Sequence, residues 1–235
     1  MTQQLREATF DLTRYRAAIF DLDGTLVHSE HVWEKAKIEV TARYGKRPSQ
    51  ALLDAHVGRG LKDFLDELFG MPLTPEMRRA IGDQIGAEAD IWLERMREPV
   101  PGAKDWLLGL VDAGLRIAIC SSSPRRHIDG AVEMLGLQDI VELAVSGAEL
   151  PVGKPDPLPF LTTLDALSLA ADAAFAVEDS VPGARAAHGA GLFTIAVGPG
   201  CTGPAYDFCP IRRETFADLM TTTRSLHRSA TTPAA

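Results

Sequence analysis

Short runs of apolar residues, spaced along most of the chain, are the clearest pattern in this sequence. Most of the runs are nearly continuous in apolar character rather than alternating, which is typical of parallel strands covered on both faces of a sheet. We therefore predict six strands, which are Arg16–Phe20, Arg116–Cys120, Val141–Val145, Ala173–Val177, Phe193–Val197 and Tyr206–Cys209.

Helix-like stretches lie between these runs. They are Ala103–Ala113, Arg126–Leu135, Pro157–Ala166 and Pro182–Ala190. A regular succession of strand, helix and strand predicts a doubly wound, Rossmann-like α/β fold with a parallel sheet.

Residues 30–98 depart from this pattern, because they contain no convincing strand and their apolar residues recur at helical spacing. We predict that they form an inserted α-helical domain within an α/β core of residues 1–29 and 99–227. Pro99–Gly102 is rich in proline and glycine and is expected to be the return linker. The small polar residues 228–235 are expected to form a frayed tail.

Composition limits the possible partners. The 235 residues carry a formal net charge of -8, which argues against nucleic acid or an anionic membrane as a partner. The chain has three cysteines without Cys-x-x-Cys spacing, so we expect neither a disulfide framework nor a zinc site.

Residues 1–16 contain no apolar segment, and no later run is long enough to span a bilayer, so a cytoplasmic protein is expected. We expect a monomer or a weak homodimer.

Candidate chemistry begins at Asp21 and Asp23, directly after the first predicted strand. If strand geometry continues through Asp23, both carboxylates leave the same side of the chain. Crowded carboxylates repel, so such a pair indicates a bound cation or two different pKa values. The alternative is a turn whose carboxylates cap backbone N–H groups.

Three more polar sequences follow predicted strands, where the binding crevice of a parallel sheet lies. Ser121-Ser122-Ser123 could bind a phosphate or start a helix. Lys154, held between Gly153 and Pro155, could pair with a carboxylate or be a solvated turn residue. Glu178-Asp179 could bind Mg²⁺ or cap the next helix.

Together these four features resemble the haloacid dehalogenase-like hydrolase superfamily. The matches are FDLDGTL at Phe20–Leu26, the strand and serine at Ile117–Ser121, GKPDP at Gly153–Pro157 and EDS at Glu178–Ser180. The resemblance covers about Arg16 to Gly198, and the helical insert matches the family's cap domain.

The resemblance implies a role for each polar residue. Asp21 would be the nucleophile that forms an aspartyl-phosphate, and Asp23 would be the general acid and base. Asp21, Asp179 and the Asp23 backbone carbonyl would hold Mg²⁺, with Glu178 acting through water. The transferred phosphoryl group would bind to Ser121, Ser122 and Lys154.

Phosphoryl transfer is favoured over other chemistry of the superfamily. Haloacid dehalogenases proper lack the second acid, which is present here as Asp23. Phosphonatases use a cap lysine; Lys35 and Lys37 are candidates for it, but Asp23 argues against that chemistry. Local sequences resemble the branch that holds hexose-phosphate phosphatases and β-phosphoglucomutase, so the implied substrate is a small phosphorylated metabolite, most plausibly a sugar phosphate.

Three residues are candidates for substrate specificity, namely Arg59, Arg125 and Trp33. Arg59 lies in a glycine-framed loop where family caps place a specificity loop, although a solvated turn arginine is equally compatible. Trp33 lines either the cleft or the core of the insert. His28 stands where an acid is common in the branch; a solvated surface or hinge histidine is the simpler interpretation.

Three other functions remain alternatives to a sugar-phosphate phosphatase. A β-phosphoglucomutase-like enzyme would pass the phosphoryl group to a sugar hydroxyl instead of water, but Trp33 stands where those mutases carry a histidine. A phosphoglycolate phosphatase would differ in substrate alone. A non-catalytic sensor of phosphorylated metabolites should have lost a catalytic acid or the lysine, and this chain retains Asp21, Asp23, Lys154 and Asp179.

Overall fold

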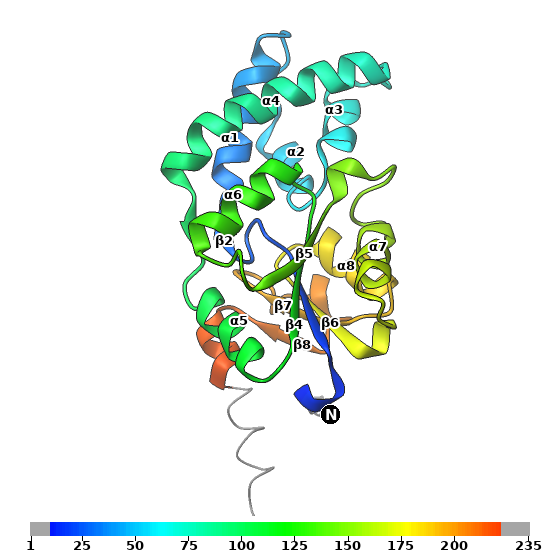
Figure 1. Cartoon of the computed structure of the whole chain (residues 1–235). Helices are drawn as coiled ribbons and strands as arrows, with labels where there is room; N and C mark the ends of the chain where they lie inside the picture. Colours follow the sequence, from blue (N-terminus) through cyan, green and yellow to red (C-terminus); the bar gives the residue numbers. More distant parts are fainter. Residues whose placement is uncertain (1–9, 222–235) are drawn as a thin grey trace, which may run out of the picture.

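A computed structural model of the chain describes residues 10–221. Six parallel strands form its central sheet, in the order β5-β4-β1-β6-β7-β8 (Figure 1). Their bounds are β1 (Ala17–Phe20), β4 (Arg116–Ser121), β5 (Val141–Ser146), β6 (Ala174–Glu178), β7 (Phe193–Val197) and β8 (Ile211–Arg213). The predicted parallel sheet and the first five predicted strands are therefore confirmed.

The sixth predicted strand, Tyr206–Cys209, is wrong. Tyr206 ends the 3-10 helix η4 (Pro204–Tyr206), and the edge strand is β8 instead. Tyr206 and Cys209 are buried against Ala196 and Cys201, and the Tyr206 hydroxyl donates a hydrogen bond to the carbonyl oxygen of Asp179. Their apolar character thus reflects burial within a turn rather than strand pairing.

Helices cover both faces of the sheet, as a doubly wound fold requires. On one face lie α5 (Ala103–Asp112) and α6 (Arg125–Leu135), and on the other lie α7 (Leu158–Leu167) and α8 (Val181–Gly189) (Figure 1). Successive residues of β1 serve opposite faces. Ala18 and Phe20 belong to the first core, whereas Ala17 and Ile19 belong to the second. This double burial explains the continuous apolar runs.

The remaining 3-10 turns are η1 (Leu12–Arg14), η2 (Gly147–Glu149) and η3 (Ala171–Ala173). Within the described residues, no helix is both long and apolar enough to cross a membrane. All three cysteines are buried and free of disulfides.

Four helices form the insert that rises above the carboxyl ends of the strands in Figure 1. They are α1 (Glu30–Ala42), α2 (Gln50–Ala55), α3 (Leu61–Phe69) and α4 (Pro75–Met96), and we call them the helical insert. Val32, Phe64 and Ile85 are among the residues of a separate apolar core within it. The helices fall in the range predicted for the inserted domain, while the domain boundaries at residues 30 and 98 stay a prediction. Residues 222–227 of the predicted core and the predicted tail at 228–235 lie outside the described residues.

A short antiparallel ribbon joins the insert to the core. It consists of β2 (Val27–His28) and β3 (Glu98–Pro99), with Val27 opposite Pro99 and His28 opposite Glu98. The sequence showed Pro99 only as part of a linker, because a two-residue strand has no detectable periodicity.

Candidate active site

The polar residues predicted to meet do follow the carboxyl ends of neighbouring strands. Asp21 comes directly after β1, Ser121 ends β4 and Glu178 ends β6. Because β1 pairs in parallel with both β4 and β6, these three ends lie at one edge of the sheet. Lys154 reaches the same edge from the loop between η2 and α7.

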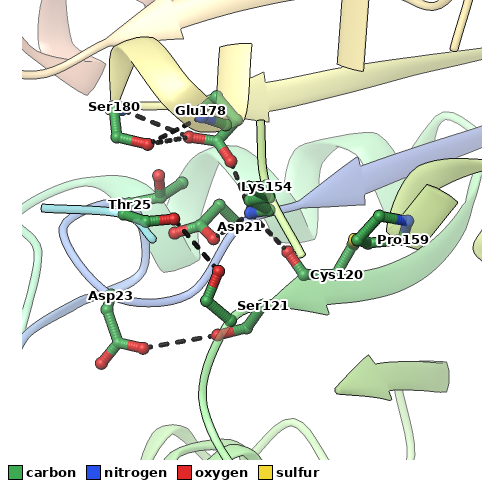
Figure 2. A network of polar contacts seen from close by, with 12 residues as sticks. Asp21, Asp23, Thr25, Cys120, Ser121, Lys154, Pro159, Glu178 and Ser180 are labelled. Atoms are coloured by element: carbon green, nitrogen blue, oxygen red, sulfur yellow. Dashed lines mark hydrogen bonds and ion pairs between the residues drawn. The ribbon is translucent and has the colours of Figure 1, made fainter. Parts of the chain in front are cut away.

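Lys154 lies at the centre of this group (Figure 2). Its Nζ is 2.5 Å from Asp21 Oδ1, 2.5 Å from Glu178 Oε1 and 2.9 Å from the Cys120 carbonyl oxygen. The side chain is buried, so the solvated alternative is excluded. Burial alone would lower the pKa of Lys154, but the two carboxylates outweigh it and raise that pKa. The ammonium is therefore fixed in its charged form beside Asp21.

Asp21, Glu178 and Asp179 form an acidic cluster. Each offers one carboxylate oxygen, and these oxygens all lie within 4.8 Å of one another. Burial raises the pKa of Asp21 against the opposing effect of Lys154, and burial together with the charge of Asp21 raises the pKa of Asp179. The negative charge of the cluster is thus only partly compensated by one lysine.

The backbone of Gly24 passes close to the Asp179 carboxylate of this cluster. Its φ is +91°, and a Cβ there would lie 2.0 Å from Asp179 Oδ2, so only glycine lets the chain pass so close to the carboxylate. Thr25 Oγ1 donates a hydrogen bond to the other Asp179 oxygen at 3.0 Å. Oxygen ligands are those that hard divalent cations prefer, so the three carboxylates could hold such an ion.

Glu178 is held from the side opposite Lys154. Its Oε2 accepts hydrogen bonds from the backbone N–H groups of Asp179 and Ser180, both at 3.2 Å. A Cβ on Gly183 would lie 1.8 Å from Glu178 Oε1, so the first turn of α8 also requires glycine. The residue that caps α8 is Ser180, whose Oγ accepts from the Gly183 N–H, and not Glu178 or Asp179 as the helix-capping alternative had it.

Asp23 lies apart from the Asp21–Lys154–Glu178 group (Figure 2). Strand β1 ends at Phe20, so the strand geometry that would direct Asp21 and Asp23 to the same side does not continue. Asp23 instead accepts hydrogen bonds from Ser123 Oγ at 2.6 Å, from Trp33 Nε1 at 3.2 Å and from Ser29 Oγ. Its carboxylate therefore joins the end of β4 to the first turn of α1.

The three serines after β4 have different partners. Ser121 Oγ lies 3.4 Å from Asp23 Oδ2 and accepts from the Ser123 N–H at 3.0 Å. Ser122 Oγ donates to the Gly58 carbonyl oxygen, 3.0 Å away in the helical insert. Helix α6 does begin at Arg125, directly after Ser123-Pro124, but its N-cap residue is Pro124 and no side chain caps it.

A cavity of about 240 Å³ lies between the core and the helical insert. The core contributes Asp21, Asp23 and residues 121–124, whereas the insert contributes its side chains, including Trp33 and Arg59. Arg125 is not among the lining residues, and its guanidinium bonds to Asp129 and the Ala144 carbonyl oxygen. His28 is exposed on β2 and lines a neighbouring depression instead.

The cavity is also lined by Lys37, which the sequence interpretation considered only as a phosphonatase lysine, and by His56, which it did not single out. Lys37 is one helical turn after Trp33, so the i, i+4 spacing on α1 was the signal that places both on one face. His56 Nε2 bonds to Glu67 Oε2 at 2.9 Å, a contact between α3 and the end of α2 that the sequence does not show.

The haloacid dehalogenase-like hydrolase family profile matches residues 15–191. The chain belongs to this family. Membership identifies it as a hydrolase.

Several characterised relatives align over most of the chain. Hexitol phosphatase B of Escherichia coli (strain K12) is 29% identical over 183 residues, which are 77% of this chain and 82% of the relative. Phosphoglycolate phosphatase of Chromobacterium violaceum is 31% identical over 207 residues, 81% of this chain and 88% of the relative.

Solved structures share the fold of this chain. CbbY from Rhodobacter sphaeroides, in complex with phosphate, aligns with a TM-score of 0.73 and 25% identity over 87% of this chain and 96% of that one. A putative β-phosphoglucomutase from Bacteroides vulgatus aligns with a TM-score of 0.79 and 23% identity over 93% and 91% of the two chains.

Proposed function

We propose that this hydrolase is a Mg²⁺-dependent phosphatase that cleaves a small phosphorylated metabolite, a sugar or polyol phosphate, through an aspartyl-phosphate. The observation that carries the proposal is the position of Lys154, whose ammonium lies 2.5 Å from Asp21 while the general-acid candidate Asp23 is held separately. The names of relatives that act on phosphate esters support the same class of reaction.

Asp21 is suited to be the nucleophile. Lys154 holds its Oδ1, and among the described residues no hydrogen bond engages its Oδ2. In the proposed first step, a carboxylate oxygen of Asp21 attacks phosphorus and the bond from phosphorus to the ester oxygen breaks. The Lys154 ammonium stabilises the negative charge on the phosphoryl oxygens during this transfer.

Asp23 is suited to move the proton. It would give its proton to the departing ester oxygen in the first step and take one from water in the second, when that water attacks the aspartyl-phosphate and releases phosphate. Ser123, Trp33 and Ser29 hold its carboxylate by hydrogen bonds, which fixes the position of the proton being transferred.

Asp21 and Asp179, with the Asp23 carbonyl, would hold Mg²⁺, and Glu178 would act through water. The fit rests on the acidic cluster, whose buried charge one lysine only partly balances, and on Gly24, which keeps space beside Asp179. A bound Mg²⁺ would supply further neutralisation of the phosphoryl charge. The helical insert would act as a cap that closes over the site and limits access of water.

A second candidate is phosphoglycolate hydrolysis, which the relatives named phosphoglycolate phosphatase favour. The two candidates differ in what lies beyond the phosphate, a chain of hydroxyls or one carboxylate. A mutase would use the same aspartyl-phosphate but transfer it to a sugar hydroxyl.

The direct test is phosphate release by the purified protein with Mg²⁺ from sugar phosphates, polyol phosphates, phosphoglycolate and nucleotides. The Asp21→Asn variant should lose release by at least about 1,000-fold, because the amide is not a nucleophile. Release by the variant near the unmutated rate would contradict the mechanism. Conversion of β-glucose 1-phosphate to glucose 6-phosphate, with a bisphosphate primer, would identify a mutase instead.

A further inference from the structure

Lys37 is a buried lysine whose ammonium forms no hydrogen bond or ion pair with the residues that the structure describes. It lies on α1, is 8% exposed and lines the cavity between insert and core. Among the described residues its Nζ forms no hydrogen bond or ion pair, and its nearest aromatic contact is the Phe64 ring, with the centroid 4.9 Å away. Lys35, two residues earlier, has an ion-pair partner in Glu39 and lies 3.2 Å from the centre of the Trp92 ring.

An ammonium has three N–H donors, and leaving them unpaired away from water costs free energy. Burial accordingly lowers the pKa of Lys37 to about 8. A methionine would fill the same space without this cost. The cost would be offset if a bound molecule accepted hydrogen bonds from the ammonium.

The helix geometry places Lys37 on the side of the cavity away from the reacting groups. Trp33, one turn earlier on the same face, donates its indole N–H to Asp23. Four residues of α-helix advance about 6 Å along the axis, so the backbone of Lys37 lies roughly that far beyond that of Trp33. A ligand whose phosphoryl group meets Asp21 would reach Lys37 with its opposite end.

Building on the proposed function, we infer that the Lys37 ammonium binds a hydroxyl oxygen at the end of the substrate away from the phosphoryl group. This makes Lys37 a specificity-determining residue and assigns the substrate to the polyhydroxylated phosphate esters.

The charges around Lys37 favour a hydroxyl over a second anionic group. Glu30, Glu34 and Asp54 line the same cavity, whereas the other cation of the insert that lines it, Arg59, is already paired with Asp63 at 3.2 Å. A distal carboxylate or phosphate would therefore meet more negative than positive charge. Hydroxyls can accept from Lys37 and donate to a neighbouring glutamate at once.

The rest of the cavity suits a carbon chain with hydroxyl groups. Leu53, Val57 and Leu61 supply apolar surface between the polar side chains. Its volume of about 240 Å³ is a little below the range of about 300–1,000 Å³ for drug-sized ligands, so it fits a metabolite.

The test compares two substrates that differ only in hydroxyls, a hexitol 6-phosphate and hexyl phosphate. Phosphoglycolate is the third substrate, because it carries a carboxylate at the end away from the phosphate. The variants are Lys37→Met and, as matched control on the same helix, Lys35→Met. Steady-state kcat/KM is measured with Mg²⁺ for each pair, and thermal unfolding checks that both variants fold.

We expect Lys37→Met to lower kcat/KM for the hexitol phosphate by about 10- to 100-fold more than for hexyl phosphate, the range for a hydrogen bond to a charged group. Lys35→Met should leave both values unchanged. Equal losses on the two six-carbon substrates would overturn the inference, as would a larger loss toward phosphoglycolate. If the unmutated protein hydrolyses none of the three, the proposed function fails first and the inference with it.

Discussion

The hydroxyl of Ser122, just beyond β4, donates a hydrogen bond to the carbonyl oxygen of Gly58, 3.0 Å away in the helical insert. Gly58 has a φ of +73°, and a Cβ there would lie 2.2 Å from Ser180 Oγ. The loop between α2 and α3 therefore contacts the core beside both β4 and α8. Ser180 has little freedom to move away, because its hydroxyl also bonds to Glu178 and to the Gly183 N–H.

Gly58→Ala should therefore keep the insert from seating on the core. The substitution combines a left-handed backbone with a steric overlap, a cost of about 1–3 kcal/mol. We expect kcat/KM to fall by about tenfold or more. The matched control is Gly60→Ala, two residues on, where φ is -68° and a Cβ would meet nothing within 4 Å. Equal activities of the two variants would show that the contact at Gly58 is not needed.

Lys154→Met should destabilise the protein as well as inactivate it. The variant leaves Asp21 and Glu178 buried without their cation, and breaking such a pair costs about 3–5 kcal/mol. The loss should be larger at pH 8 than at pH 5, because unpaired buried carboxylates are tolerated when protonated. Lys104→Met, which removes one bond to the Leu135 carbonyl oxygen, should cost about 1 kcal/mol at both pH values. Urea unfolding measures the free energy of unfolding of both variants at pH 5 and pH 8. A loss in Lys154→Met that does not depend on pH would contradict the role given to Lys154.

Mg²⁺ should stabilise the protein by binding to the acidic cluster. Protein freed of metal by a chelator should gain about 2.7 kcal/mol of unfolding free energy at a Mg²⁺ concentration of 100 times Kd. Asp179→Asn removes a carboxylate from the cluster and should abolish most of this gain. Asp172→Asn, an exposed residue of η3, is the control and should leave the gain intact. A Tm that does not respond to Mg²⁺ in the unmutated protein would argue against the site.

Lys37 should make stability depend on pH in the alkaline range. Its pKa is about 8 in the folded protein and 10.5 for the free side chain, so the unfolded chain binds more protons between these values. Stability should then rise with pH from about 8 to 10.5. Below pH 8 the buried charge costs about 3 kcal/mol, since each pKa unit corresponds to about 1.4 kcal/mol.

Lys37→Met should accordingly be more stable than the unmutated protein at pH 7 and lose most of this advantage by pH 10. Lys35→Met is again the control, without such a gain. Urea unfolding at the two pH values measures both effects. A Lys37→Met protein that is less stable at pH 7 would mean that the ammonium has a stabilising partner.

Most of the sheet could be predicted because β1, β4, β6 and β7 are buried on both faces, which the sequence shows as nearly continuous apolar runs. The same rule failed at Tyr206–Cys209, where a turn buries apolar side chains without pairing. The rule also did not detect β2 and β3, because strands of two residues are too short to show an apolar run.

Asp21 and Glu178 could be predicted because they stand at the carboxyl ends of strands, whereas Lys154 comes from a loop and was indicated by its GKPDP sequence. What surrounds Asp23 could not be predicted, since Ser123 reaches it from 100 residues away along the chain. The burial of Lys37 depends on how α1 packs in the insert and against the core, which local sequence does not determine. Arg125 has the right residue type and an adjacent position, yet it bonds to Asp129 and lies outside the cavity.

The ribbon of Val27–His28 with Glu98–Pro99 has a consequence for the history and engineering of this chain. The peptide enters and leaves the helical insert at paired positions, which in antiparallel strands are about 5 Å apart. A short turn could therefore join Val27 to Pro99 and omit the insert without displacing any strand of the six-stranded sheet. Insertions of other lengths and shapes could occupy the same junction, provided that they replace the hydrogen bonds that Ser29 and Trp33 donate to Asp23.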